Sequence, residues 1–234
     1  MRQAALLPVL CLLLCQIMRP QASAPYITAD QIVARVQQQN HVRAQSLKGY
    51  TGLRIYRLEY KGLGSLSAEM VVQSEFVPPA TKRFRIISER GSQLLRDKVF
   101  RKLLEAETEA ANPAAQRATA LSGENYRFQL IGEQPEGEHD CYVISVEPLR
   151  NDKFLYRGKI WVDSKDYAVV KIDAEPAKNP SFWIARTEVV QVYGRVGEFW
   201  LPINNRSVSH IKVGGTATLT IEYGQYATSV AVRH

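Results

Sequence analysis

The chain has 234 residues, of which 45% are hydrophobic and 23% charged, and its formal net charge at pH 7 is +7. The lysines and arginines are spread along the chain and form no basic run, so we expect no nucleic-acid partner. A chain of this length fits one all-β domain, because barrels and sandwiches reach this size as single units.

Residues 1–24 have the layout of a secretory signal peptide. Arg2 gives a positive start, residues 4–15 are an apolar run that is too short to span a bilayer, and Ala22-Ser23-Ala24 supplies small residues for cleavage. A lipoprotein signal ending at Cys15 fits less well, because a leucine stands where a small residue is expected. We therefore expect residues 1–24 to be removed and residues 25–234 to form a single domain with a net charge of +5.

Cys141 is the one cysteine left after the predicted cleavage, so no internal disulfide can form. It follows His139 at strand spacing, and the two side chains would share a face, which is one arrangement for thiol chemistry. The simpler interpretation, which we adopt, is a buried cysteine. The histidines are too scattered for a metal site, and no hydrolase motif occurs. We expect no enzymatic activity, no metal and no cofactor.

The first element of the mature chain is a predicted helix. Thr28 and Gln31 form a capping box, and Ile32, Val33 and Val36 follow as a narrow apolar stripe. The stripe predicts a helix of about three turns that ends in the polar run 37–41 and packs on a sheet.

The period then changes to that of strands. Apolar residues alternate with polar ones in the segment 66–76, which predicts a half-buried antiparallel strand; the apolar members are Leu66, Ala68, Met70, Val72 and Phe76. The segment 82–89 predicts the next strand, with Phe84 and Ile86 on one face. The segment 53–60 changes its apolar face midway, which a bulge or burial on both faces would explain.

Residues 92–107 interrupt the strands with a helical period. Apolar residues recur every four positions, which predicts an amphipathic helix that could cover one mouth of the sheet; the proposed lid residues are Leu95, Val99, Phe100 and Leu103. The alanine-rich stretch 106–121 contains Pro113, and we interpret it as a broken second helix or an irregular loop.

Strand patterns resume at Tyr126 and continue to the end of the chain. The predicted strands cover 126–132, 141–148, 154–163, 167–174, 184–193, 199–201, 207–213 and 216–226. Short strands at this spacing predict a barrel or a strongly curved sheet. A hairpin turns at Ser164-Lys165-Asp166, and its alternation places Ile160 and Val162 on one face and Trp161 on the other, among charged residues. Val213-Gly214-Gly215-Thr216 predicts a second tight turn.

The order of these elements, together with five short motifs, resembles the LolA-like family of periplasmic outer-membrane lipoprotein-sorting proteins over nearly the whole mature chain. The motifs are Ala68-Glu69-Met70, Phe84-Arg85-Ile86-Ile87, Ile160-Trp161-Val162-Asp163, Phe199-Trp200-Leu201-Pro202 and Ile221-Glu222-Tyr223. The resemblance implies a mainly β fold with helices (α+β). Its sheet would be a highly curved antiparallel one, or an unclosed β-barrel, covered by the N-terminal helix and the helical insert.

The resemblance also implies a function. The protein would be a monomeric lipid or lipoprotein carrier in the periplasm of a Gram-negative bacterium, holding acyl chains in the hollow of the half-barrel and meeting a partner protein of the outer or inner membrane. The alternative is a protein-interaction or envelope-sensing module that uses the same sheet without cargo. The predicted lipid-contacting residues are Met70, Val72, Phe76, Phe84, Ile86, Tyr126, Phe128, Leu130, Leu219, Ile221 and Tyr223.

Periodicity alone cannot separate such a lining from an ordinary packed core. Trp183 follows a loop-like stretch with Pro180, and it could lie partly exposed at the rim of the barrel. A rim tryptophan could dock a partner or a membrane interface, although a plain plug of the rim is the simpler interpretation.

Overall fold

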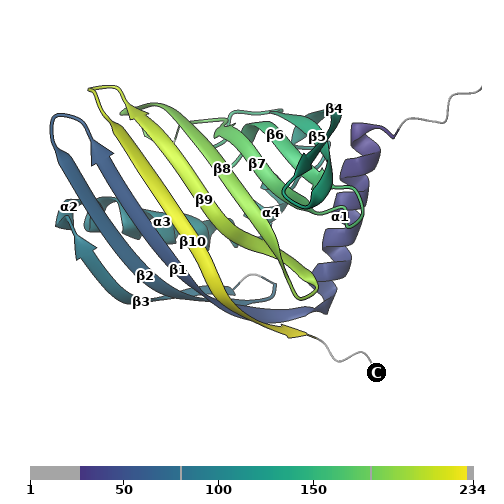
Figure 1. Ribbon diagram of the computed structural model, residues 1–234, viewed down its shortest axis with the longest axis horizontal. Helices are drawn as coiled ribbons and strands as arrows, with labels where there is room; N and C mark the ends of the chain where they lie inside the picture. Colours follow the sequence, from purple (N-terminus) through teal and green to yellow (C-terminus); the bar gives the residue numbers. More distant parts are fainter. Residues whose placement is uncertain (1–26, 80, 180, 231–234) are drawn as a thin grey trace, which may run out of the picture.

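A computed structural model describes residues 27–79, 81–179 and 181–230 of the protein (Figure 1). The predicted signal peptide, residues 1–24, lies outside these ranges. The helices are α1 (Ala29–Ser46), α2 (Gln93–Leu95), α3 (Arg101–Ala110) and α4 (Pro113–Thr119), with a π-helical turn η1 (Arg96–Phe100) between α2 and α3. In the described part of the chain, no helix is both long and apolar enough to cross a membrane.

The strands are β1 (Leu47–Lys61), β2 (Ser65–Val77), β3 (Thr81–Gly91), β4 (Tyr126–Glu136), β5 (His139–Pro148), β6 (Tyr156–Asp163), β7 (Val169–Pro176), β8 (Ile184–Val196), β9 (Phe199–Ile211) and β10 (Thr216–Val230). They form a ten-stranded sheet in the order β3-β2-β1-β10-β9-β8-β7-β6-β5-β4, with every neighbouring pair antiparallel.

The sheet is curved (Figure 1). Within the described ranges it is open because its edge strands β3 and β4, at the two ends of the strand order, do not pair with each other. The pairing of β1 with β10 joins the first and last strands in the middle of the sheet. The predicted fold class, a mainly β fold with an unclosed, helix-covered sheet, is confirmed.

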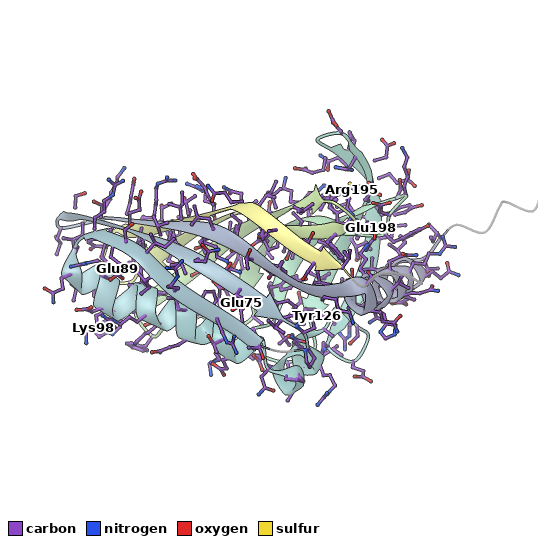
Figure 2. All side chains as sticks on the ribbon, turned by 90° about the horizontal axis from the view of Figure 1, so that it is seen from below. Glu75, Glu89, Lys98, Tyr126, Arg195 and Glu198 are labelled. Carbon is purple, nitrogen blue, oxygen red and sulfur yellow. The ribbon has the colours of Figure 1, made fainter. Side chains whose placement is uncertain are left out.

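Helices cover the two ends of one sheet face, which we call the covered face. Helix α1 packs over the β4–β7 end, where Ile32, Val33 and Val36 join an apolar core. The segment α2–η1–α3 packs over β1, β2 and β10 around the fully buried Phe100. Figure 2 shows this second helix, labelled at Lys98, along one side of the strands.

Helix α1 is longer than the sequence predicted, although its capping box is confirmed: Thr28 and Gln31 exchange side-chain and backbone hydrogen bonds. The polar run after Val36 stays helical because its side chains reach other elements. The Gln37 Nε2 donates to the Leu121 carbonyl at 2.7 Å, and the Arg43 guanidinium donates to the Asp166 carbonyl. Tertiary contacts therefore extend the helix past the end of its apolar stripe.

The helical insert, residues 93–119, largely follows its prediction. The predicted helix is present but contains the π-helical turn, and α3 continues to Ala110. Asn112 then caps α4 by accepting from the backbone N–H of Ala114, with Pro113 at the first position. The broken second helix, one of the two alternatives for this stretch, is confirmed.

Three strand predictions need correction. The predicted strands 199–201 and 207–213 are one strand, β9, which accommodates Pro202 beside the register shift at Tyr193 of β8. The hairpin strand β6 starts at Tyr156 rather than Phe154. Its partner β7 starts at Val169, because Tyr167 has a φ of +47° and still belongs to the turn.

The apparent change of face in β1 is not a bulge between its apolar residues. Arg54, Tyr56 and Leu58 alternate regularly on the covered face and are all buried. Leu53 and Ile55 lie on the opposite face, where they are half-buried. The register shift between β1 and β10 lies earlier, between Thr51 and Leu53.

The β6–β7 hairpin separates two cores. Ile160 and Val162 are fully buried on the covered face beneath α1. Trp161 is buried on the opposite face in a small cluster with Cys141, Val143 and Val170. The predicted alternation is therefore present, but Trp161 is shielded, with the Lys171 ammonium 4.7 Å from its ring centroid.

Candidate functional site

Between the two helix-covered ends, the covered face holds an apolar cavity of about 240 Å³, which we call the sheet cavity. Its walls come from the loop before β6 and from strands β6–β9. The lining residues are Lys153, Phe154, Leu155, Tyr156, Ile172, Ala174, Glu175, Pro176, Val189, Gln191, Tyr193 and Asn205. Most of these are apolar, and the charged members are the half-exposed Lys153 and Glu175.

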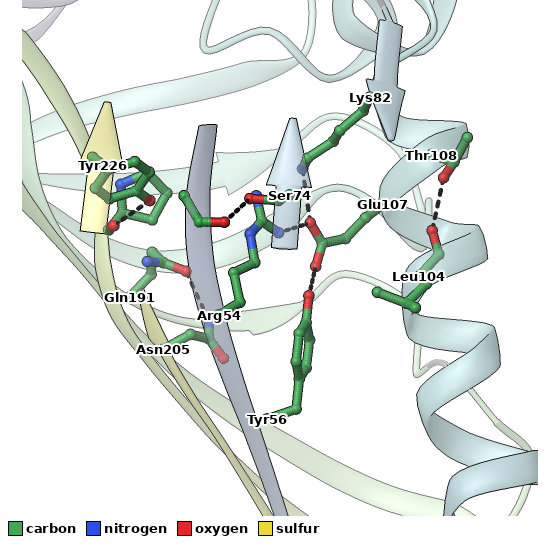
Figure 3. Close-up of polar contacts among 12 residues, drawn as sticks. Arg54, Tyr56, Ser74, Lys82, Leu104, Glu107, Thr108, Gln191, Asn205 and Tyr226 are labelled. Carbon is green, nitrogen blue, oxygen red and sulfur yellow. Dashed lines mark hydrogen bonds and ion pairs between the residues drawn. The ribbon is translucent and has the colours of Figure 1, made fainter. Parts of the chain in front are cut away.

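Two amides, joined by a hydrogen bond, form the uncharged polar part of this lining (Figure 3). The Asn205 Nδ2 donates to the Gln191 Oε1 at 2.9 Å, and the Gln191 Nε2 donates to the Asn204 carbonyl at 2.9 Å. Burial raises the pKa of Tyr193 to about 12 and that of Tyr156 well above its ordinary value, so both phenols are neutral near pH 7. The sheet cavity is thus suited to an uncharged, largely apolar group.

A second cavity of about 560 Å³ lies against α3 and α4, and we call it the insert cavity. Its lining is more polar and consists of Glu109, Ala115, Ala118, Thr119, Asn151, Asp152, Lys153, Phe154, Lys178 and Asn179. The two cavities are neighbours, since Lys153 and Phe154 line both. The Lys153 Nζ lies 4.5 Å from the Phe154 ring centroid and 2.9 Å from the Glu109 Oε2.

The C-terminal part of α3 is joined to the sheet by an ionic cluster, which we call the clamp (Figure 3). Glu107 of α3 projects towards β1 and β3. Its carboxylate accepts a hydrogen bond at 2.7 Å from the Tyr56 hydroxyl and another at 2.7 Å from the Lys82 ammonium, and it pairs with the Arg54 guanidinium. These four residues define the clamp.

The charges of the clamp depend on one another. Burial alone would raise the pKa of Glu107, but Arg54 and Lys82 outweigh it and hold the pKa below its ordinary value. For Lys82 burial prevails over Glu107 and lowers the pKa. For Arg54 burial opposes the charged form, but Glu107, Tyr56 and Tyr223 together outweigh burial and raise the pKa.

Aromatic rings surround the buried Arg54 side chain, which is 3% exposed. Its guanidinium carbon lies 5.3 Å from the Phe84 ring centroid and 5.1 Å from that of Tyr223. Within the described residues, its Nε has no hydrogen-bond acceptor. The clamp thus places two cations and one anion under the insert, so removing Glu107 would leave both cations unpaired.

The predicted lipid-contacting residues fall into two cores rather than one lining. Six of them lie beneath the insert on β2, β3 and β10, three lie beneath α1 on β4, and Phe76 and Ile86 belong to neither core. In the first group Met70, Val72 and Ile221 are buried in a core with Phe100, and Phe84, Leu219 and Tyr223 pack around it. Phe76 instead contacts Tyr50, with 5.3 Å between ring centroids.

The second group is Tyr126, Phe128 and Leu130, which pack in the core under α1. Ile86 of β3 belongs to neither core and is 42% exposed. None of these predicted residues lines the sheet cavity or the insert cavity. As ligand contacts they stay predictions. The predicted lid residues do lie over the sheet: Phe100 is fully buried, and Leu95, Val99 and Leu103 pack on the same core.

The residues that line the sheet cavity were missed by sequence reasoning, as was the clamp. Alternation along β8 puts Thr187, Val189 and Gln191 on one face, but it does not show which stretch of that face a helix leaves uncovered. One usable sign was present. Arg54 and Gln191 are polar residues at positions that alternate with core residues, which marks a buried polar feature.

The His139-Asp140-Cys141 segment lies away from both cavities. Cys141 is buried on the opposite face, and burial, helped by Asp163, raises the pKa of its thiol to about 11. Such a thiol is a poor nucleophile. The His139 Nδ1 lies 3.0 Å from Asp163, a contact that supports the hairpin turn. Across the described ranges, no three His, Cys, Asp or Glu residues gather into a metal site.

Residues 65–228 match a family described as a family of unknown function, DUF5686. The chain belongs to this family. The match covers β2 through most of β10 and therefore includes the insert, the clamp residues Lys82 and Glu107, and both cavities. No curated protein matches the chain.

Solved structures of similar shape share little sequence with this DUF5686 protein. A DUF1329 family protein from Desulfovibrio piger has a TM-score of 0.42 and 11% identity over 88% of this chain and 95% of its own. A putative outer membrane lipoprotein-sorting protein domain from Vibrio parahaemolyticus has the same score and identity over 86% and 94%. A LolA superfamily protein from Nitrosomonas europaea has a TM-score of 0.35 and 12% identity over 87% and 94%.

Proposed function

We propose that this protein binds an acyl-bearing molecule, a lipid or a lipidated protein, on the covered face of its sheet and carries it through the cell envelope as part of outer-membrane lipoprotein sorting. The observation that carries the proposal is the pairing of an apolar cavity with a neighbouring polar one. An amphiphile needs this arrangement, because its chain must leave water while its head group stays hydrated. No enzymatic step is part of the proposal.

The size of the sheet cavity limits what the closed protein holds. A dry cavity of about 150 Å³ admits one benzene ring, and sites for larger ligands span roughly 300–1,000 Å³. At about 240 Å³ the sheet cavity takes only a segment of an acyl chain. Each further methylene left in water costs about 0.8 kcal/mol, so a full chain requires more apolar surface.

The additional surface lies beneath the helical insert. Met70 and Val72 are covered there by Phe100. If the clamp opens and α3 lifts, this core joins the sheet cavity along the same sheet face. The predicted lipid-contacting residues would then become accessible in the loaded state, with the insert serving as a lid.

The leader-like residues 1–24 support an exported location, and we propose the periplasm of a Gram-negative bacterium. A carrier there needs a donor and an acceptor, so a partner protein at the inner or outer membrane is part of the proposal. We expect the carrier itself to be monomeric.

One observation favours the alternative, a protein-interaction or envelope-sensing module. Phe182 and Trp183 are 76% and 59% exposed in the β7–β8 loop. A module of that kind would use this surface and leave the cavities empty. The two functions differ in whether a molecule with an acyl chain travels with the protein.

The test is lipid mass spectrometry of protein recovered after export from its own cell envelope, followed by binding of a fluorescent fatty acid to the delipidated protein. We expect near-stoichiometric acyl-bearing molecules. Val189→Trp should fill the sheet cavity and lower affinity for the fatty acid by at least about tenfold, which corresponds to losing the burial of roughly two methylenes.

The matched control is Val190→Trp. Val190 lies on the same strand with its side chain on the opposite face, paired in register with Asp173 and Arg206. This variant should bind the fatty acid as the wild type does. Folded wild-type protein that is free of lipid and does not bind the fatty acid would contradict the carrier function.

A further inference from the structure

Three connections between strands meet at one end of the strands, at the upper left of Figure 1. They are the β1–β2 turn (62–64), the β7–β8 loop (177–183, without residue 180) and the β9–β10 turn (212–215). The Tyr60 hydroxyl at the end of β1 donates to the Gly214 carbonyl at 3.2 Å. The Lys212 N–H donates to the Trp183 carbonyl at 2.9 Å. The three connections therefore form one continuous surface.

Large apolar side chains project from each of these connections. Leu63 is fully exposed, Phe182 is 76%, Val213 is 66% and Trp183 is 59% exposed. We call these four residues the apolar rim. Single exposed apolar residues are common on protein surfaces, but four at the tips of adjoining loops form a patch that calls for a partner.

The rim is also basic. Lys61, Lys178 and Lys212 lie in or next to the three connections, and the segments 61–65, 177–183 and 212–216 contain no acidic residue. The Lys212 Nζ is 4.1 Å from the Phe182 ring centroid. Glu59 approaches Lys61 at 3.9 Å, but both side chains are largely exposed, so the pair neutralises little.

We propose that the apolar rim docks this protein on the surface of an anionic lipid bilayer. Phe182 and Trp183 would enter the head-group layer, where tryptophan is favoured because its ring is apolar and its N–H is polar. The lysines would lie against anionic head groups.

The shape of the rim favours a bilayer over a protein partner. The apolar residues project from loop tips and line neither of the two cavities, so a deformable lipid surface can surround them. A protein partner would need a matching set of pockets for side chains that come from three separate connections. The positive charge next to each loop tip adds electrostatic attraction to a negatively charged membrane.

The rim lies close to the insert cavity along the chain. Lys178 and Asn179 of the β7–β8 loop line that cavity, a few residues before Phe182. Docking through the rim would therefore bring one wall of the insert cavity near the membrane. The docking itself does not require that either cavity holds a lipid.

The test is sedimentation of protein recovered after export, so that the leader does not contribute, with vesicles of phosphatidylcholine alone or mixed with phosphatidylglycerol. We expect binding to the anionic vesicles and a blue shift of tryptophan emission. The double variant Phe182→Ser with Trp183→Ser should lower the partition coefficient by at least about tenfold. Lys178→Gln and Lys212→Gln should each lower it by about fivefold.

The control is Ile87→Ser with Ile131→Ser, which removes exposed apolar side chains, 51% and 52% exposed, from β3 and β4 and not from the rim. It should bind vesicles as the wild type does. Absence of vesicle binding by the wild type, or undiminished binding by the rim double variant, overturns the proposal. Binding of a soluble protein through the rim, without vesicle binding, would overturn it as well and assign the rim to a protein partner.

Discussion

The two ends of the sheet are covered by helices that are held in different ways. At the β4–β7 end, α1 packs through Ile32, Val33 and Val36 into a largely apolar core, and Gln37 and Arg43 add hydrogen bonds to other elements. At the β1–β3 end, the insert packs through the fully buried Phe100 and the partly buried Leu95, Val99 and Leu103, and the ionic clamp at Glu107 adds a buried charge cluster. Among the described residues, the same sheet face thus has one helix packed without a buried ion pair and one whose apolar packing is combined with a buried ionic cluster.

This difference separates a fixed cover from a movable one. Lifting α1 would expose apolar side chains to water and would release no buried ion pair of the described residues. Lifting α3 would break the clamp, but Glu107, Arg54 and Lys82 would recover hydration that burial denies them. We infer that the insert opens at a lower free energy than α1, and the following variants are chosen to break or sharpen this contrast.

The largest effect is expected at the α1 end. Ile32 is fully buried, and Ile32→Ala should lower the global free energy of unfolding by about 2–5 kcal/mol, because it removes buried methylenes and leaves a cavity. Urea denaturation followed by circular dichroism measures the change.

Phe100→Ala is the matched substitution at the other end, since Phe100 is also fully buried. If the insert opens separately from the rest of the protein, Phe100→Ala can lower the global free energy of unfolding by no more than the free energy of that opening. Proteolytic cleavage within residues 93–119 should increase at the same time. A global loss as large as that of Ile32→Ala, without faster cleavage in the insert, would show that the two covers are equally fixed.

A smaller effect is expected from the clamp itself. Glu107→Gln keeps an acceptor for Tyr56 but leaves Arg54 and Lys82 without their counter-charge, and it should lower the free energy of opening of the insert by about 1–3 kcal/mol. The expected result is faster hydrogen exchange in α3 and stronger binding of a fluorescent fatty acid by the opened protein.

Glu109→Gln is the control for this variant, because Glu109 lies one half-turn further along the same helix and pairs with Lys153 in an exposed contact. It should change the same free energy by less than about 1 kcal/mol. Equal effects of the two substitutions would mean that the buried clamp does not hold the insert.

Much of the fold could be predicted from the sequence because local patterns specify it directly. The capping box at Thr28 defines the start of α1, and the alternation in β2 defines its buried face. The end of α1 could not be predicted, since Gln37 and Arg43 bind residues more than 80 positions away. Pro202 likewise led to the wrong prediction of a break within β9. The strand continues because a register shift in the neighbouring strand β8 accommodates the proline.

The site was harder to predict than the fold. Periodicity identified the covered face, but the boundary between covered and open surface depends on where the insert ends. The apparent face change in β1 came from Arg54, a charged residue at a buried position, whose partner Glu107 is 53 residues away. A charge at a core position was the available sign of the clamp, and we interpreted the pattern as a bulge or as burial on both faces.

Native-state hydrogen exchange tests the contrast between the two covers most directly. The amides of Val36 in α1 and Leu104 in α3 would be followed in low concentrations of denaturant. Val36 should exchange through global unfolding, with the full dependence on denaturant, whereas Leu104 should exchange through an opening of lower free energy and weaker dependence on denaturant. The same free energy and the same denaturant dependence at both amides would contradict a movable lid.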